Sequence, residues 1–164
     1  MTSVEIFEDL GRRDAFGPLV SRARKFLVSS VPSDSHMWNL VALQIFLEEM
    51  GHEVVNLGAC VPTELLLRRC HAERPDCVVI SSVNGHGHID GARLITALRA
   101  DPGLARLNVV IGGKLGVEGE ANSQFEQELL ELGFDAVFHV GAGDSAHAIE
   151  SFRRYISSHV EQVT

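Results

Sequence analysis

The sequence lacks the surplus of basic residues, the long apolar runs and the leader pattern that would mark several large protein classes. Its 14 Lys and Arg residues face 22 Asp and Glu, which gives a net charge of -8. Nucleic-acid phosphates are bound by surplus Lys and Arg, so this balance argues against DNA or RNA as a partner. No apolar run approaches the ~20 residues that span a bilayer. The N-terminus shows no basic stretch followed by an apolar core, and we expect a cytoplasmic protein without a membrane segment.

Cysteine and nucleotide-binding motifs are also scarce. The three cysteines, Cys60, Cys70 and Cys77, are odd in number and form no C-x-x-C pair, so we expect reduced thiols that serve as apolar filling. No phosphate-binding G-x-x-x-x-G-K-[ST] loop and no G-x-S-x-G serine motif occurs. The spacing Gly85-x-Gly87-x-x-x-Gly91 is one residue too long for the dinucleotide fingerprint.

What the sequence does contain is an alternation of short β-rich runs with longer helical runs. Hydrophobic residues make up 45% of the 164 residues, enough for one domain with a full core. The runs rich in Val, Ile and Phe predict five buried strands. These strands are expected at Lys25 to Val31, Glu53 to Leu57, Cys77 to Ser82, Asn108 to Ile111 and Ala136 to Val140.

Helices are expected between and after these strands. Their periodicity, Gly stop signals and a Pro start signal place them at Trp38 to Met50, Pro62 to Cys70, Asp90 to Arg99, Ser123 to Leu132 and Ser145 to His159. Residues 1–24 have a mixed-charge, helical composition, so we expect an N-terminal extension before a domain of residues 25–164.

Strands that alternate with helices predict a doubly wound α/β fold with a five-stranded parallel sheet. We expect the flavodoxin-like (Rossmann-like) order 2-1-3-4-5. Ligands of such sheets bind outside the carboxyl ends of the strands, near the switch point between strands 1 and 3. Four loops, several rich in glycine, fall at that edge: residues 32–37, 81–88, 112–118 and 141–145.

His36 is the most informative residue in these loops, because it follows Asp34 by two positions between a strand and a helix. A carboxylate that accepts the Nδ1 proton leaves Nε2 free as a metal ligand or a base. The alternative is a capping segment, in which Asp34 or Ser35 holds the helix N-terminus and His36 is merely exposed.

Three further histidines, His86, His88 and His139, are expected near the same edge. A His-x-His pair with a third histidine is a pattern that binds zinc. The glycines around His86 and His88 favour solvated loop histidines over a zinc site.

Taken together, the loops resemble the cobalamin-binding domain of cobalamin-dependent mutases, and most of all the small subunits of glutamate (methylaspartate) mutases. The family's D-x-H-x-x-G appears as Asp34-Ser35-His36-Met37-Trp38-Asn39, its S-x-L as Ser81-Ser82-Val83 and its Gly-Gly as Gly112-Gly113. The resemblance covers about Phe26 to Tyr155.

The resemblance implies that cobalamin binds with its benzimidazole displaced from cobalt and that His36 is the lower cobalt ligand. Asp34 would orient the imidazole, Ser81 and Val83 would contact the buried base, and the backbone from Gly113 to Glu118 would border the nucleotide tail. The cofactor-binding residues so implied are Ser33, Asp34, Ser35, His36, Met37, Asn39, Ser81, Ser82, Val83, Gly112, Gly113, Lys114, Leu115, Gly116, Val117 and Glu118.

The resemblance also implies an adenosylcobalamin-dependent isomerase that rearranges a carbon skeleton by radical chemistry. The substrate would be held mainly by a separate large subunit with a barrel fold, for which this chain has no room. Alternatives are a cobalamin carrier or sensor for methyl transfer or regulation, and a flavodoxin-like interaction protein without a cofactor. Asn39 departs from the family's glycine, and we expect it to crowd the cofactor tail.

Overall fold

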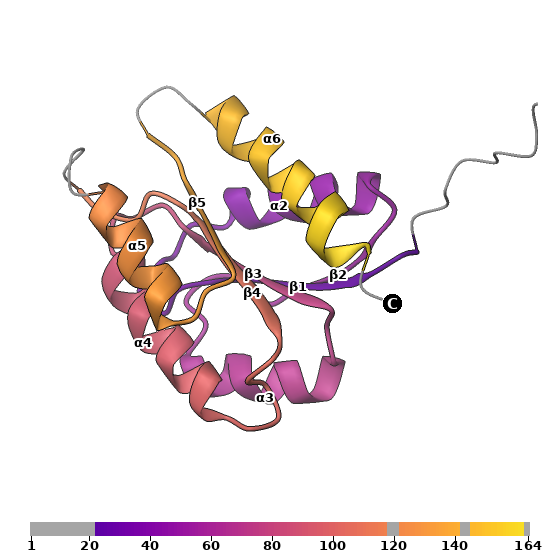
Figure 1. Ribbon diagram of the computed structural model, residues 1–164, viewed down its shortest axis with the longest axis horizontal. Coiled ribbons are helices and arrows are strands. Elements are labelled where there is room, and N and C mark those ends of the chain that lie inside the picture. The colour runs from indigo at the N-terminus through magenta and orange to yellow at the C-terminus, as the bar shows by residue number, and fades with distance from the viewer. Residues whose placement is uncertain (1–21, 118–121, 142–144, 163–164) are drawn as a thin grey trace, which may run out of the picture.

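The computed structural model describes residues 22–117, 122–141 and 145–162 of the chain. They form one sheet of five parallel strands, with helices on both faces (Figure 1). The strands are β1 (Lys25–Ser30), β2 (Glu53–Asn56), β3 (Cys77–Ser82), β4 (Asn108–Gly113) and β5 (Ala136–His139). Their order is β2-β1-β3-β4-β5, which confirms the predicted flavodoxin-like topology.

The helices divide between the two faces of the sheet. Helix α2 (Trp38–Glu49) and helix α6 (Ser145–Tyr155), which continues as a π-helical turn η2 (Ile156–Val160), cover one face. Helices α3 (Thr63–Glu73), α4 (Gly87–Ala100) and α5 (Asn122–Leu132) cover the other. Right-handed crossovers between parallel strands produce this two-sided arrangement.

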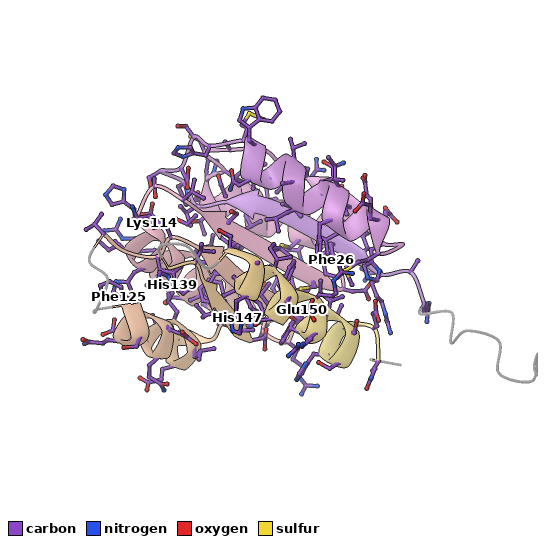
Figure 2. All side chains as sticks on the ribbon, turned by 90° about the horizontal axis from the view of Figure 1, so that it is seen from above. Phe26, Lys114, Phe125, His139, His147 and Glu150 are labelled. Carbon is purple, nitrogen blue, oxygen red and sulfur yellow. The ribbon has the colours of Figure 1, made fainter. Side chains whose placement is uncertain are left out.

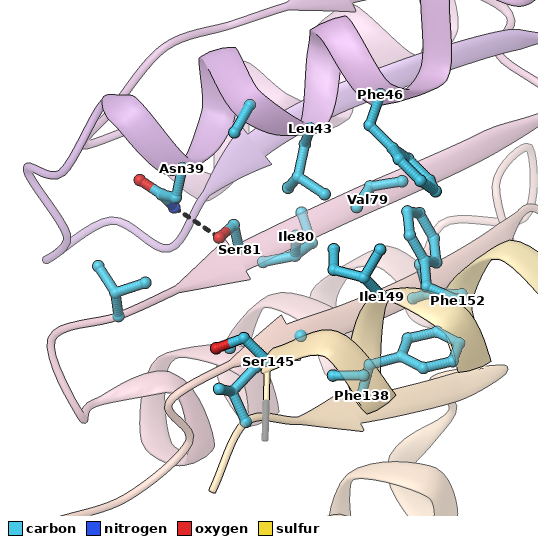
Figure 3. A pocket seen from close by; sticks show the side chains of 17 residues that line it. Asn39, Leu43, Phe46, Val79, Ile80, Ser81, Phe138, Ser145, Ile149 and Phe152 are labelled. Atoms are coloured by element: carbon cyan, nitrogen blue, oxygen red, sulfur yellow. Dashed lines mark hydrogen bonds between the residues drawn. The ribbon is translucent and has the colours of Figure 1, made fainter. Parts of the chain in front are cut away.

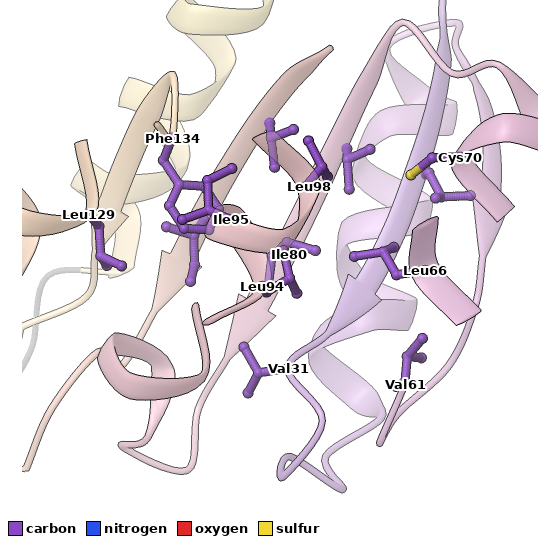
Figure 4. Packing of buried hydrophobic residues seen from close by; sticks show 14 of the residues in the cluster. Val31, Val61, Leu66, Cys70, Ile80, Leu94, Ile95, Leu98, Leu129 and Phe134 are labelled. Carbon is purple, nitrogen blue, oxygen red and sulfur yellow. The ribbon is translucent and has the colours of Figure 1, made fainter. Parts of the chain in front are cut away.

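Each strand contributes to two hydrophobic clusters, because successive side chains of a strand point to opposite faces. Leu27, Val78 and Ile80 pack against α3, α4 and α5, where Leu66, Leu94 and Leu98 are fully buried (Figure 4). The intervening residues Phe26, Val28 and Val79 pack against α2 and α6, with Leu40, Leu47 and Phe152. The same alternation directs Ser81 toward α2 and α6, and Ser82 toward α4.

Most predicted boundaries agree with the structure to within two residues, but two helices are longer than predicted. Helix α4 begins at Gly87 rather than Asp90, because the backbone of Asp90 already bonds to the carbonyl of His86. Helix α3 continues to Glu73 and ends where Arg74 takes a left-handed conformation with φ 49°. Strand β4 extends through Gly112 and Gly113, since ladder hydrogen bonds need only backbone.

The expected N-terminal extension, residues 1–24, lies almost wholly outside the described residues. Arg24, at the end of that extension, packs onto the domain: its backbone N–H donates to Nδ1 of His52, and its guanidinium donates to the carbonyl of Glu161. Within the described part of the chain, no helix is long and apolar enough to cross a membrane.

The cysteines are all free thiols, as predicted. Cys70 and Cys77 are buried, and burial raises the pKa of the Cys70 thiol to about 12. The prediction of apolar filling holds for these two residues. It is wrong for Cys60, which is exposed in the loop between β2 and α3 and has a φ of 52°.

Candidate functional site

The loop after β1 brings Asp34 and His36 into direct contact. The Nδ1 atom of His36 lies 2.7 Å from Oδ1 of Asp34, and the backbone N–H of His36 donates to the same oxygen at 3.0 Å. The Asp34 side chain is fully buried, whereas the His36 side chain is 59% exposed. A bond at Nδ1 fixes the tautomer, so the lone pair of Nε2 is directed outward and is available to a metal or a proton.

The other oxygen of Asp34 connects this loop to the loop after β3. The backbone N–H groups of Val83 and Asn84 donate to Oδ2 at 2.6 and 3.2 Å. Burial raises the pKa of the Asp34 carboxyl, but the N–H donors of Val83 and His36, with the His36 ring and the N–H of Asn84, outweigh burial and hold that pKa below its ordinary value. The carboxylate is therefore charged and joins two loops of the switch point.

The capping alternative for this segment is wrong. The N-cap of α2 is Met37, and no side chain caps the helix there. The carboxylate oxygens of Asp34 instead accept hydrogen bonds from the loop after β3 and from His36. Its arrangement is that of a residue that orients an imidazole, because a helix cap would direct the carboxylate at the first-turn N–H groups.

A cavity of about 520 Å³ lies between the sheet and the helices α2 and α6 (Figure 3). Strands β3, β4 and β5 form its floor, and Leu43 and Phe46 of α2 face Ile149 and Phe152 of α6 across it. Its lining is almost wholly apolar. A cavity of this size with an apolar lining is typical of small-molecule sites.

The cavity adjoins the Asp34–His36 pair through Val83, which lines it and bonds to Asp34 by its backbone. Two polar side chains meet beside Val83, because the amide Nδ2 of Asn39 donates to Oγ of Ser81 at 2.5 Å. The Ser81 hydroxyl accepts this bond and keeps its own proton to donate to a ligand. The Oδ1 atom of Asn39 is buried and has no hydrogen-bond partner among the described residues.

Gly112 and Gly113 lie on the cavity floor and leave no room for side chains. A Cβ on Gly113, whose φ is +107°, would lie 2.1 Å from the carbonyl oxygen of Ser82. A Cβ on Gly112 would lie 3.2 Å from the carbonyl oxygen of Phe138. The Lys114 N–H then donates to the Ser82 carbonyl at 2.6 Å, so the chain leaves the sheet directly beside the cavity.

The remaining predicted site residues differ in their exposure and in the face of the sheet on which they lie. Ser33 donates to Asp90 at 2.5 Å and accepts from Asn84, whereas Ser35 and Met37 are exposed. Ser82 lies on the opposite face of the sheet from the cavity, and Leu115 is fully buried in the core of that face. Beyond Lys114, which is exposed, Gly116 is buried and Val117 is exposed, and Glu118 lies outside the described residues.

The three further histidines do not come together. His86 is the N-cap residue of α4, and His88 lies inside that helix, stacked on Phe125 at 4.1 Å with Nε2 2.6 Å from Glu128. The expectation of a solvated His88 is therefore wrong. His139 ends β5 opposite Gly113, and Figure 2 shows it at the same end of the molecule as Lys114. Across the described ranges, no three His, Cys, Asp or Glu side chains gather as a metal site.

Two features of the site were not found from the sequence. Asn84 donates to both the carbonyl and the hydroxyl of Ser33 and so adds a second tie between the two loops. Its place in the loop after β3, between Val83 and Gly85, was the available signal. The aromatic lining of the cavity, Phe46, Phe138 and Phe152, is indistinguishable in sequence from core residues.

Comparison with known proteins gives a consistent result. The B12 binding domain family matches residues 24–152. The glutamate mutase sigma subunit of Halobacterium salinarum is 32% identical over 120 residues, which cover 73% of this chain and 79% of that protein. That of Fusobacterium nucleatum subsp. nucleatum is 29% identical over 118 residues, or 72% of this chain and 86% of that one. A novel cobalamin-binding protein from Desulfitobacterium hafniense shares the fold, with a TM-score of 0.63 at 23% identity, over 82% of this chain and 60% of that one.

Proposed function

The chain belongs to the B12-binding domain family, and from this premise we propose that it is the adenosylcobalamin-binding small subunit of a glutamate mutase. With a separate large subunit it would convert L-glutamate to threo-3-methylaspartate in the cytoplasm. The names of its relatives support the reaction. The observation that carries the proposal is the exposed His36, tied at Nδ1 to a buried carboxylate, beside a preformed apolar cavity.

The residues present fit the cofactor. His36 offers Nε2 to cobalt, and Asp34 holds the ring in position. The apolar cavity takes the base that a histidine ligand displaces from cobalt, and the Ser81 hydroxyl is the donor for a ring nitrogen of that base. Residues 25–164 would form the binding domain.

Backbone around the two glycines fits the tail that leads to the base. Gly112 and Gly113 present bare backbone along the cavity floor, which a nucleotide tail would be able to approach closely. The following residues, Lys114 to Glu118, would border the nucleotide. The fully buried Leu115 would contribute only its backbone to that border.

Adenosylcobalamin supplies radical chemistry through its weak cobalt–carbon bond. The chain's own part is to bind the lower side of the cofactor and fix its orientation. Its upper side is left for a partner, which we expect to be a large subunit with a barrel fold that holds the substrate and excludes water.

Filling the cavity tests the assignment of the base. Ala148 is buried in the wall of the cavity on α6, whereas Ala146 is exposed on the same helix outside it. We expect Ala148→Phe to weaken adenosylcobalamin binding at least tenfold in an absorbance titration, and Ala146→Phe to bind as the unchanged chain does. If both folded variants bind the cofactor equally well, the cavity does not hold the displaced base.

The reaction is tested by reconstitution with a glutamate mutase large subunit. The purified chain with adenosylcobalamin alone should not form 3-methylaspartate, and addition of the large subunit should produce it. Rapid turnover by the chain alone would contradict the proposal that a separate large subunit holds the substrate. If the complex binds the cofactor tightly but does not convert glutamate, the chain is a cofactor carrier and glutamate is excluded as the substrate.

A further inference from the structure

The apolar cavity between α2 and α6 opens on the surface of the molecule. Ala42 of α2 and Ile149 of α6 line it, and both are exposed, Ile149 by 42%. Figure 3 shows Ile149 and Phe152 on the α6 side of the cavity. Apolar surface in contact with water is unfavourable, and atoms that line a gap lose contacts with neighbours. An apolar segment of the chain that enters the cavity is therefore stabilised there while no cofactor is bound.

The start of the chain supplies such a segment, in residues 1–21 outside the described structure. On a helical projection four apolar residues fall on one side and three acidic residues on the other. The apolar residues are Val4, Ile6, Phe7 and Leu10, and the acidic residues are Glu5, Glu8 and Asp9. Thr2 and Glu5 have the spacing of a capping box, and Gly11 is a stop signal. The pattern predicts a short amphipathic helix whose apolar side needs a surface to cover it.

The N-terminal extension joins the domain at the ends of the two helices that border the cavity. Arg24 immediately precedes β1, and its backbone N–H donates to Nδ1 of His52 at 3.3 Å. Its guanidinium donates to the carbonyl of Glu161 at 3.0 Å. His52 follows the C-terminal end of α2, and Glu161 follows η2, which continues α6. The extension therefore starts on the face of the sheet that carries the cavity, between α2 and η2.

The connection to the apolar segment is long enough to reach the cavity. Residues 11–23 separate Leu10 from Arg24, and a fully extended chain of that length spans roughly 45 Å. Helix α2, which borders the cavity, has 12 residues, so it is about 18 Å long. The guanidinium of Arg153 lies 4.9 Å from the centre of the Phe46 ring, which lines the cavity. This positive charge complements the acidic side of the segment.

We propose that residues 4–10 place their apolar side in the cavity when no cofactor is bound, and that the tail base of the cofactor displaces them. This inference rests on the proposed function, because that function assigns the cavity to the tail base. A competitor on the same chain has a high effective concentration, so even weak docking lowers the affinity for the cofactor. The B12-binding domain family matches the chain from residue 24 onward, so this device lies outside the matched part.

Crosslinking in the full chain tests the docking without a cofactor. A Cys60→Ser background removes the exposed thiol. Phe7→Cys is combined either with Ile149→Cys at the cavity or with Leu132→Cys, which is also 42% exposed but lies on α5, across the sheet. We expect a short thiol-reactive crosslinker to join the cavity pair at least tenfold faster than the control pair, as measured by mass spectrometry. Saturating adenosylcobalamin should remove this difference.

Cofactor titrations of two further variants test the competition. Phe7→Asp puts a charge on the apolar side of the segment, so we expect it to bind adenosylcobalamin at least threefold more tightly than the unchanged chain. Thr2→Asp adds the same charge outside the apolar side and keeps a residue that caps helices, so it should bind as the unchanged chain does. Absorbance gives the dissociation constants, and circular dichroism confirms that each variant is folded.

The outcomes separate this inference from the proposed function. Equal crosslinking of the two pairs overturns the docking, and so does a crosslink between two chains, which would assign the cavity to a second copy. Equal affinities of Phe7→Asp and Thr2→Asp overturn the competition, while cofactor binding stands. If the chain and both variants bind no adenosylcobalamin, the proposed function fails and the competition with it, whereas a selective crosslink within the chain still supports the docking.

Discussion

The His36 ring and the Asp34 carboxylate meet at 2.7 Å, and the same carboxylate accepts two backbone N–H groups from the loop after β3. One buried side chain thus sets the orientation of the imidazole and the spacing of the two loops at the switch point of the sheet. Because Asp34 is fully buried and charged, loss of any of these donors is costly. The geometry of the candidate ligand and the integrity of the site therefore depend on the same residue.

Replacement of His36 by alanine should abolish histidine coordination of cobalt and weaken cofactor binding. The measurement is electron paramagnetic resonance of the cob(II)alamin complex, with the protein labelled with nitrogen-15 at histidine. His86→Ala is the control, because His86 is also exposed and lies at the same edge of the sheet. Histidine hyperfine coupling that persists in His36→Ala would reject His36 as the ligand.

Replacement of Asp34 should destabilise the fold as well as the site. Asp34→Ala leaves the buried N–H groups of Val83 and Asn84 without an acceptor, and we expect a loss of about 3 kcal/mol in the free energy of unfolding. Asp34→Asn keeps one acceptor oxygen and should lose less. Urea denaturation of the three proteins measures both values. A loss below about 0.5 kcal/mol in Asp34→Ala would show that these bonds are not structural.

Gly113 should tolerate no side chain. A Cβ would lie 2.1 Å from the Ser82 carbonyl oxygen, and the φ of +107° is unfavourable for any other residue. We expect Gly113→Ala to lower the unfolding free energy by roughly 3 kcal/mol and to disturb the cavity floor. Gly141→Ala is the matched control, since a Cβ there meets no described atom within 4 Å. Equal stability of the two variants, measured by thermal unfolding, would contradict the close packing of β3 and β4.

His52 should make the protein less stable in mild acid. Burial lowers the pKa of its imidazole, which Glu161 opposes only in part, while Arg24 lowers it further and Asp76 raises it. The folded state therefore binds the proton less well than the unfolded chain. The stabilisation is fully present above about pH 6.5, the ordinary histidine value, and is lost as the pH falls toward the lower folded pKa.

Unfolding free energies at pH 7.5 and pH 5.5 test this dependence. We expect a smaller loss on acidification in His52→Gln than in the unchanged chain, and an unchanged loss in His147→Gln, where the histidine is exposed. The comparison between the two variants removes the contribution of carboxylates and of the other histidines. Identical pH dependence in all three proteins would exclude His52 as the cause.

Much of the fold could be predicted because it follows from local patterns. Buried parallel strands such as Cys77–Ser82 are continuous apolar runs, and the alternation with helices restricts the topology to a few orders. Helix boundaries that depend on capping were harder to predict from the sequence. The start of α4 at Gly87 is set by a backbone bond to His86 and by close packing against Ser82, neither of which leaves a sequence signal.

By itself the sequence predicted the strand order and the edge of the sheet at which ligands bind, because apolar runs and their alternation with helices suffice for those. The Asp34-x-His36 pair was visible as a pattern, but its role and that of Ser81 were implied only by the resemblance to a known family. Only the tertiary structure decided that Phe46 and Phe152, which pack in a hydrophobic cluster, also border an open cavity, and that Asn39 bonds to Ser81. These facts depend on how helices distant in sequence pack across the sheet, and that packing is a property of three-dimensional fit between side chains.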